Sequence, residues 1–245
     1  MTKLISHKYF FFAIVMLMIV APRILLAQNT ITISTFEEDT AVVKASNLLK
    51  QAYKKLGINM ELTRLPASRA LIEANSGELI DGELIRTAGL TKQYSNLVQI
   101  SVKIATFKIS VFSKKIDFHV NGWGSLKPYE VSFKRGFKGM EKHADGLNVK
   151  RAPSSEAALK MLDMDRTDIV VVPYLDGLTI RKKVNLPQLK ILEPPLEQIP
   201  LYHYIHKNHK ELIPRITQVL KAMEQNGEIE RFWETIENEF MSNIK

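Results

Sequence analysis

The 245-residue sequence contains no cysteine. Disulfide bonds, thiolate metal sites, a cysteine nucleophile and a lipid-modified cysteine anchor are therefore excluded. Several enzyme motifs are also missing: the serine elbow G-x-S-x-G, the phosphate loop G-x-x-x-x-G-K-[ST], the dinucleotide motif G-x-G-x-x-G and the zinc motif H-E-x-x-H. The fold must therefore be held by its hydrophobic core alone, and no familiar catalytic motif predicts an enzyme.

A strong excess of charge of either sign is also lacking. The 34 basic and 26 acidic side chains give a formal charge of +8. Three of the basic side chains lie in residues 1–27, where there is no acid, which leaves +5 for the remainder. So small an excess does not by itself predict binding to nucleic acid. Apolar residues make up 45% of the chain, as in an ordinary globular protein.

One long apolar run is present, near the N-terminus. The basic segment MTKLISHK precedes thirteen apolar residues, Tyr9–Ala21; Pro22 ends the run, and Ala27 precedes the polar QNT. This layout predicts a secretory signal peptide over residues 1–27, because the run is short for a membrane-spanning helix. An uncleaved N-terminal anchor is the alternative. An exported chain without disulfides suits a bacterial periplasm.

Beyond residue 30, strand-like segments alternate with segments of helical apolar periodicity. Strands are predicted at 31–35, 58–65, 78–85 and 102–112, then at 129–133, 148–152, within the apolar run 168–175, and at 194–207. Helices are predicted at 41–56, 66–77, from residue 137 onward, and at 154–164, 212–223 and 229–240. This alternation predicts an α/β fold in which mostly parallel strands are flanked by helices.

Two arginines and a phenylalanine lie where the first strands end. Arg69 falls in the first helical turn after the second predicted strand, Arg86 at the end of the third and Phe36 at the end of the first. In a parallel sheet the strand ends and the following helix starts face one crevice. Guanidinium groups there can hold a carboxylate or a phosphate. The alternative is that both arginines are ordinary surface residues and that Phe36 belongs to the core.

The later segments repeat this arrangement. Arg135 and Gly136 follow the strand that ends at Phe133, and Gly136 is predicted to open a helix whose free N–H groups bind an anion. Tyr174 comes directly after the buried part of the run 168–175. The predicted ligand-binding residues are Phe36, Arg69, Arg86, Arg135, Gly136 and Tyr174.

One pattern suggests a metal site, the H-x-x-H-x-x-H spacing of His203, His206 and His209. On a strand, residues three apart point to opposite faces, so His203 and His206 would diverge. No acidic ligand lies among the three histidines. We therefore expect neither a metal site nor a cofactor.

An ordered set of segments resembles a known family. The segments are ASNLLKQAYKKLG, LPASRALIEANSGELIDGE, YSNLVQISVKIATFKISVFSKK, SSEAALKMLDMDRTDIVVV and VLKAMEQNGEIERFW. Together they resemble the family 3 extracellular solute-binding proteins, the amino-acid-type periplasmic binding proteins of type II architecture. The resemblance implies two lobes, each a mostly parallel sheet flanked by helices, joined by two crossing strands that close on a small ligand. It implies lobe one at residues 28–112 and 197–245, and lobe two at 113–196.

Two positions depart from the pattern of that family. Members that bind amino acids carry an arginine after a T-x-x-R-like turn, and here Tyr94 stands near that place. They also carry an acidic residue just beyond the later apolar strand, where this chain has Pro173 and Tyr174. The resemblance therefore implies a divergent member.

The combined prediction is an exported, monomeric, non-enzymatic solute-binding protein. It would trap a small anionic or zwitterionic solute, amino-acid-like or an organic acid, for an inner-membrane ABC permease. A periplasmic sensor that presents its closed form to a membrane receptor is the second hypothesis. A lyase-type enzyme on the same fold is the third, and no convincing acid–base pair supports it. Nucleic acid is not expected as a partner.

Overall fold

The computed structural model describes residues 30–36 and 40–241, so the predicted signal peptide lies outside the described residues. No helix within these ranges is both long enough and apolar enough to cross a membrane. In chain order the principal elements are β1 (Thr30–Thr35), α2 (Thr40–Lys54), β2 (Asn59–Arg64), α3 (Ala67–Ser76), β3 (Gly82–Thr87), β4 (Leu97–Ser113), β5 (Glu130–Lys134), α4 (Lys138–Glu141), β6 (Asn148–Ala152), α5 (Ser155–Asp163), β7 (Ile169–Pro173), α6 (Tyr174–Lys183), β8 (Lys190–His206), α7 (Leu212–Gln225) and α8 (Glu228–Met241).

The described strands form one mixed sheet in the order β2-β1-β3-β8-β4-β7-β5-β6. At one end β1 runs parallel to β2 and β3, and at the other β5 runs parallel to β6 and β7. The long strands β4 and β8 are antiparallel to each other and to their outer neighbours. The predicted α/β class is confirmed, but the sheet is mixed rather than mostly parallel, because β4 and β8 pair in antiparallel fashion with each other and with their outer neighbours. The two sheets expected from the resemblance are instead continuous, because β4 and β8 pair along most of their length.

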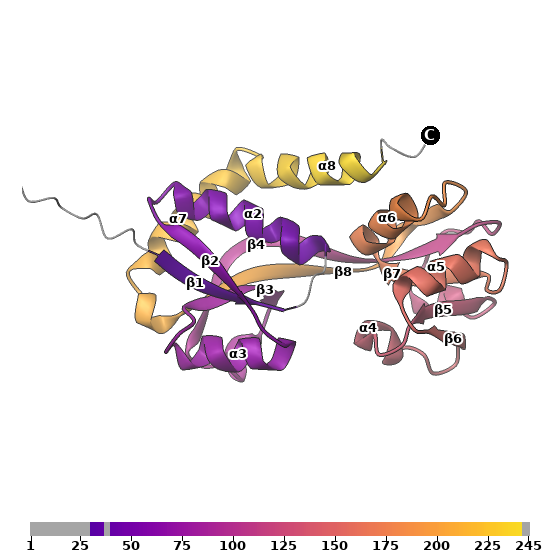
Figure 1. The fold of residues 1–245 in the computed structure, drawn as a ribbon, viewed down its shortest axis with the longest axis horizontal. Helices are drawn as coiled ribbons and strands as arrows, with labels where there is room; N and C mark the ends of the chain where they lie inside the picture. The colour runs from indigo at the N-terminus through magenta and orange to yellow at the C-terminus, as the bar shows by residue number, and fades with distance from the viewer. Residues whose placement is uncertain (1–29, 37–39, 242–245) are drawn as a thin grey trace, which may run out of the picture.

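These two long strands give the molecule its elongated form. Each has 17 residues, and their pairing runs from Leu97↔His206 to Ser113↔Lys190. At a rise of about 3.3 Å per residue each is roughly 55 Å long. Figure 1 shows them crossing from the part that contains β1–β3 to the part that contains β5–β7.

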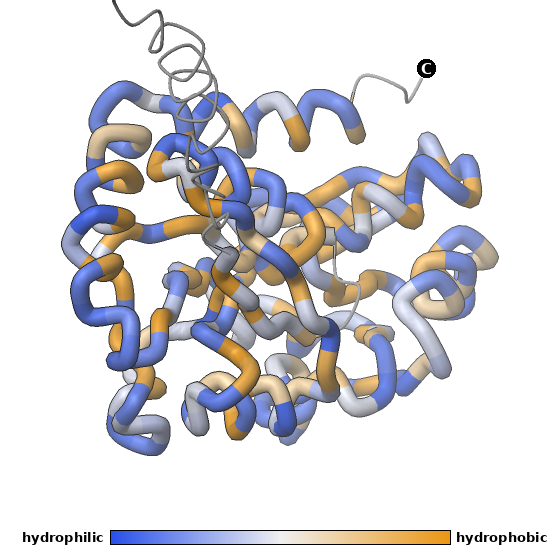
Figure 2. The backbone as a smooth tube through the Cα atoms, turned by 60° about the vertical axis from the view of Figure 1, so that its left-hand side comes forward, coloured by the Kyte–Doolittle hydropathy of each residue, from blue (hydrophilic) through white to orange (hydrophobic). Residues whose placement is uncertain are grey.

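The buried side chains gather separately at the two ends of the sheet. At the β1–β3 end, α2, α7 and α8 cover one face of the sheet and α3 the other (Figure 1). At the β5–β7 end, one cluster includes Met140 of α4 and another includes Leu159 of α5. Hydrophobic and hydrophilic residues alternate along α8 (Figure 2), as expected for helices that bury one face. Each end therefore has hydrophobic cores of its own.

Local signals in the sequence mark the ends of two helices. Pro66 precedes α3, and Gly77 ends that helix with a φ of 68°, its N–H donating to the carbonyl oxygen of Glu73. Ser154 caps α5, because its Oγ accepts a hydrogen bond of 3.0 Å from the N–H of Ala157. Such signals act within a few residues and do not depend on the rest of the fold.

Several local predictions were wrong. Helix α6 was not predicted, because Tyr174–Lys183 has no apolar face of helical period. Gly177 of α6 packs against the ring of Phe112, so contact with β4 stabilises a helix that periodicity does not show. Helix α4 has only four residues, and β3 begins at Gly82 rather than at residue 78.

One buried polar pair joins α2 to β8. His203 is fully buried; its Nδ1 donates to the carbonyl oxygens of Glu83 and Leu84 at 2.9 and 3.0 Å. Its Nε2 accepts a hydrogen bond of 2.7 Å from the hydroxyl of Tyr53. Burial lowers the pKa of His203 to about 4, despite the hydrogen bonds from its ring. The imidazole is therefore neutral in the folded protein at physiological pH.

This histidine should make stability depend on pH. Above pH 6.5 the His203 imidazole is neutral in both the folded and the unfolded protein. Below pH 6.5 it takes up a proton in the unfolded chain, whereas in the folded protein it stays neutral down to about pH 4. His203 thus reduces the free energy of unfolding by about 2.5 kcal/mol between pH 7 and pH 4.5. In His203→Gln the loss over this interval should be smaller by about that amount, as measured by urea unfolding at the two pH values. Equal losses in both proteins would contradict the assignment.

Candidate functional site

A β-bulge in β3 brings an acid and an arginine to the same side of the strand. Glu83 pairs with Tyr204 of β8 and Arg86 with Tyr202, so β3 uses three steps where β8 uses two. On a regular strand, residues three apart point to opposite faces. The extra residue of the bulge cancels this alternation. The Nε of Arg86 consequently lies 2.7 Å from Oε1 of Glu83.

Arg86 has three partners, which lie in its own strand, in α3 and directly after β1. Besides its bond to Glu83, its Nη2 donates to the carbonyl oxygen of Ala67, the first residue of α3, at 3.0 Å. Its guanidinium carbon lies 3.9 Å from the ring centroid of Phe36, directly after β1. The side chain is 14% exposed. The structure thus joins two of the six predicted residues, Phe36 and Arg86, at the ends of β1 and β3.

Glu83 is the residue at this site that sequence reasoning missed. Its side chain is fully buried, and Ser34 of β1 donates a hydrogen bond to its Oε2. Burial raises the pKa of Glu83, and the nearby Arg86 and the hydrogen bond from Ser34 oppose that shift. A single acid within the apolar segment GELI could have indicated a functional residue. However, the alternation of a regular strand places Glu83 on the opposite face from Arg86.

Arg69, the other arginine of this region, lies differently. Its side chain is 67% exposed, and its Nε lies 3.4 Å from Oε1 of Glu73, one turn further along α3. It is two residues beyond Ala67, which Arg86 contacts. Arg69 therefore lies at the same edge of the fold but is solvated and paired within its own helix.

The prediction for Gly136 is wrong in its physical basis. Gly136 adopts a φ of 76°, and α4, which begins two residues later, is only one turn long. Its N–H already donates to Oε1 of Glu141 at 3.2 Å. Arg151 of β6 also binds Glu141, at 2.9 Å, and its hydrogen bonds lower the pKa of that carboxyl. The expected helix start with unpaired N–H groups is therefore not found here. Glu141 occupies this edge among basic residues, which include the exposed Arg135.

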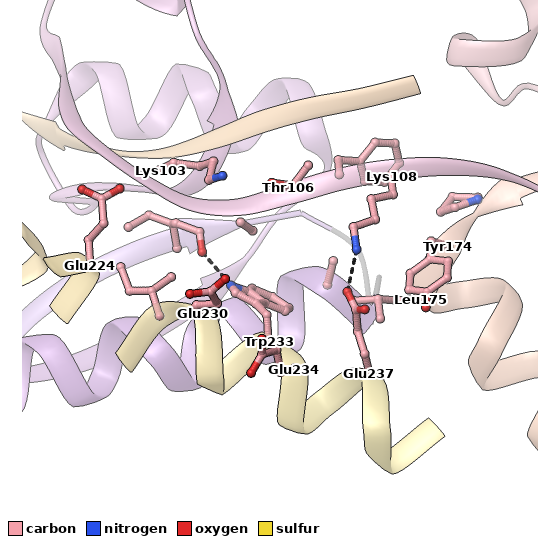
Figure 3. A pocket seen from close by; sticks show the side chains of 16 residues that line it. Lys103, Thr106, Lys108, Tyr174, Leu175, Glu224, Glu230, Trp233, Glu234 and Glu237 are labelled. Carbon is pink, nitrogen blue, oxygen red and sulfur yellow. Dashed lines mark hydrogen bonds and ion pairs between the residues drawn. The ribbon is translucent and has the colours of Figure 1, made fainter. Parts of the chain in front are cut away.

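Tyr174, the first residue of α6, lines a pocket of about 490 Å³ between β4, α6 and α8. In Figure 3 it lies beside Lys108 of β4, whose Nζ is 5.0 Å from the Tyr174 ring centroid and 2.8 Å from Oε1 of Glu237. Burial, then the charges of Glu237 and Glu193, raise the pKa of Tyr174 to about 12, so the phenol stays neutral. None of the other five predicted residues lines this pocket.

The three histidines of the candidate metal pattern have separate partners. His203 binds Tyr53, as described above. The Nδ1 of His206 accepts from the N–H of Asn208, and the Nε2 of His209 lies 2.6 Å from Oδ1 of Asp81. His203 and His206 do lie on one strand, as predicted, and contact different parts of the molecule.

Comparisons with solved structures identify the fold. An ancestral cationic amino acid solute-binding protein superposes with a TM-score of 0.69 at 16% identity, covering 86% of this chain and 96% of its own. A probable amino-acid ABC transporter extracellular-binding protein of Bacillus subtilis gives 0.67 at 16% identity, covering 83% and 96%. The chain has the type II periplasmic-binding-protein fold. A histidine kinase sensor domain with similarity to periplasmic binding proteins shares it, with a TM-score of 0.62 at 14% identity and coverage of 85% and 96%.

Solved structures with this type II fold thus include amino-acid solute-binding proteins at low sequence identity and a sensor domain. No protein-family model matches the chain. An uncharacterized protein of Shewanella oneidensis is 26% identical over 225 residues, which are 86% of this chain and 84% of that protein. The comparisons therefore show the fold, and the function has to be argued from the site.

Proposed function

We propose that this protein is an exported binding protein that traps a small amino-acid-like solute and passes it to an inner-membrane ABC permease. The observation that carries the proposal is the anchored guanidinium of Arg86 at the strand ends of a fold shared with amino-acid-binding proteins. Open α/β sheets bind ligands at such strand ends. A partly exposed arginine held there by neighbouring groups is preorganised to bind a carboxylate.

In this proposal the two ends of the sheet are the two lobes. Lobe one comprises residues 28–112 and 197–245, and lobe two comprises 113–196. Separate hydrophobic clusters at the two ends support this division, as does the small number of strands, β4 and β8, that cross between them. A ligand that contacts both lobes stabilises the closed arrangement, and a membrane partner would bind that arrangement.

The proposed contacts come from both lobes. Phe36 and Arg86, with Arg69 two residues along α3 from the Arg86 contact, supply the aromatic face and the cations of lobe one. Arg135 and Tyr174 supply a cation and a neutral phenol from lobe two. The N–H of Gly136 could bind the ligand only if its hydrogen bond to Glu141 were broken. The site offers donors to an anionic group and aromatic surface to an apolar side chain.

A sensor role is the second candidate, because a histidine kinase sensor domain has the same fold over 85% of this chain. Both roles require the same ligand binding, and they differ in the membrane partner. Deletion of the gene should abolish uptake of the solute if the protein serves a permease. Normal uptake together with a lost transcriptional response would favour the sensor.

A thermal-shift screen tests the proposal. The panel would contain the twenty L-amino acids, with organic acids, phosphorylated compounds and sugars as competing classes. A ligand that binds only the folded state adds about 2.7 kcal/mol of stability at a concentration of one hundred times its Kd. We expect an amino acid to raise the melting temperature, and isothermal titration calorimetry would confirm binding to a single site. Stabilisation by sugars alone would overturn the proposal.

A further inference from the structure

We infer that Glu83 is a positioning residue that holds Arg86 in its ligand-binding orientation and makes this part of the site prefer singly charged carboxylate ligands. The charge preference rests on the proposed function, since it assumes that Arg86 contacts the ligand. The positioning role concerns the free protein and depends on the contacts of Glu83 alone.

The β3 bulge is what makes the Glu83–Arg86 pair possible. Without it the two side chains would leave opposite faces of the strand. With it, Oε1 of Glu83 lies 2.7 Å from Nε of Arg86. Its other carboxylate oxygen is held by Ser34 of the neighbouring strand. Glu83 is thus fixed at both oxygens and can fix the arginine in turn.

The remaining contacts of Arg86 define which of its donors face a ligand. Nε is used by Glu83, one Nη2 hydrogen by Ala67, and one face of the guanidinium by Phe36. Among the described residues, Nη1 has no recorded partner. A guanidinium has five N–H donors, so the Nη1 edge and one Nη2 hydrogen are left to bind an incoming oxygen pair.

The fully buried Glu83 also sets the charge at this point. Arg86 and the hydrogen bond from Ser34 oppose the effect of burial on the pKa of Glu83. In its ionised form Glu83 makes the pair neutral as a whole, while the outward N–H groups of Arg86 remain strong donors. A ligand carboxylate in direct contact with Nη1 is still attracted, because it is closer to the guanidinium than to Glu83. A second negative charge further away experiences the attraction and the repulsion almost equally. The pair therefore attracts one negative group in direct contact and gives a second, more distant one almost no advantage.

The test compares the wild type with Glu83→Gln and Glu83→Asp. Glutamine keeps the size and removes the charge; aspartate keeps the charge and shortens the reach by one methylene. The first readout is the Arg86 Nε–H signal in ¹⁵N NMR, assigned by its absence in Arg86→Lys. The second is the ratio of the dissociation constants for L-glutamine and L-glutamate by calorimetry. Asp81→Asn is the matched control, because it removes a neighbouring carboxylate that pairs with His209 rather than with Arg86.

We expect the protected Nε–H signal of the wild type to be lost in both Glu83 variants and retained in Asp81→Asn. L-Glutamine should bind about tenfold more weakly to both Glu83 variants than to the wild type. In Glu83→Gln the preference should shift about fivefold toward L-glutamate, because a positive charge is uncovered. Glu83→Asp should keep the ratio of the wild type. The Nε–H signal thus reports on positioning and the ratio of dissociation constants on charge. If Glu83 had a structural role only, the ratio would not differ between Glu83→Gln and Glu83→Asp.

Persistence of the Nε–H signal in both Glu83 variants would overturn the positioning role. An unchanged ratio in Glu83→Gln would overturn the charge preference. If the wild type binds neither amino acid and the thermal-shift panel is also negative for amino acids, the proposed function and the charge preference both fail. The Nε–H signal then decides the positioning role alone.

Discussion

Replacing Arg86 by alanine is expected to lower the free energy of unfolding by about 3–5 kcal/mol. Glu83 is fully buried, and Arg86 supplies its ion pair at 2.7 Å. When the arginine is removed, the carboxylate keeps the hydrogen bond from Ser34 but has no countercharge among the described residues. A buried charge without a partner either destabilises the fold or takes up a proton. Urea unfolding at pH 7 would measure the loss.

Arg69→Ala is the matched control for this prediction. Both residues are arginines at the same edge, but the Arg69 side chain is 67% exposed, and within the described part of the chain its ion pair is with Glu73 of the same helix. Exposed pairs of this kind contribute at most about 0.5 kcal/mol. The double variant Glu83→Gln/Arg86→Ala should regain about 1–3 kcal/mol relative to Arg86→Ala, because no buried charge is left unpaired. Similar losses for Arg69→Ala and Arg86→Ala would contradict the structure.

The same substitution bears on ligand binding. Loss of a hydrogen bond to a charged group weakens binding by about 1.5–3 kcal/mol, which is roughly a 10- to 150-fold increase in Kd. Binding of the amino acid that most stabilises the wild type should weaken by this factor in Arg86→Ala, as measured by calorimetry below its melting temperature. Retained affinity would show that Arg86 is structural only.

The second large effect is expected for Gly82→Ala. Gly82 begins β3 and pairs with Ile205 of β8. A Cβ at this position would lie 2.3 Å from the backbone carbonyl oxygen of Tyr204, and backbone cannot turn aside as a flexible side chain can. The two strands would have to separate. We expect a loss of about 3 kcal/mol in the free energy of unfolding, at the upper end for overpacking.

Gly124→Ala serves as the control for Gly82→Ala. An added Cβ there meets nothing within 4 Å, and the backbone is not in the left-handed region. Its free energy of unfolding should stay within about 0.5 kcal/mol of the wild type. Because Gly82 adjoins Glu83, Gly82→Ala should also disturb the Arg86 Nε–H signal. Equal stability of the two glycine variants would show that β3 and β8 tolerate separation.

For Arg69 and Arg86, the sequence predicts the position in the fold but not the contacts. Chain order correctly placed Arg69 and Arg86 at one edge, because strand ends and helix starts share an edge in parallel sheets. It treated them as equivalent, whereas one is solvated and the other is held by Glu83, Ala67 and Phe36. Likewise Gly136 was placed correctly after β5, but its N–H is taken by Glu141, five residues later.

The sequence by itself determined the absence of disulfides, the α/β class, and most helices and strands with their caps. These features depend on residue composition and on periodicities within a few turns, which each segment carries alone. Only the tertiary structure decided the continuity of the sheet, the existence of α6 and the assembly around Arg86. The bulge that places Arg86 beside Glu83 forms when β3 pairs with β8, a strand more than a hundred residues later in the chain. No local pattern encodes that pairing, so the site became visible only when the strands were together.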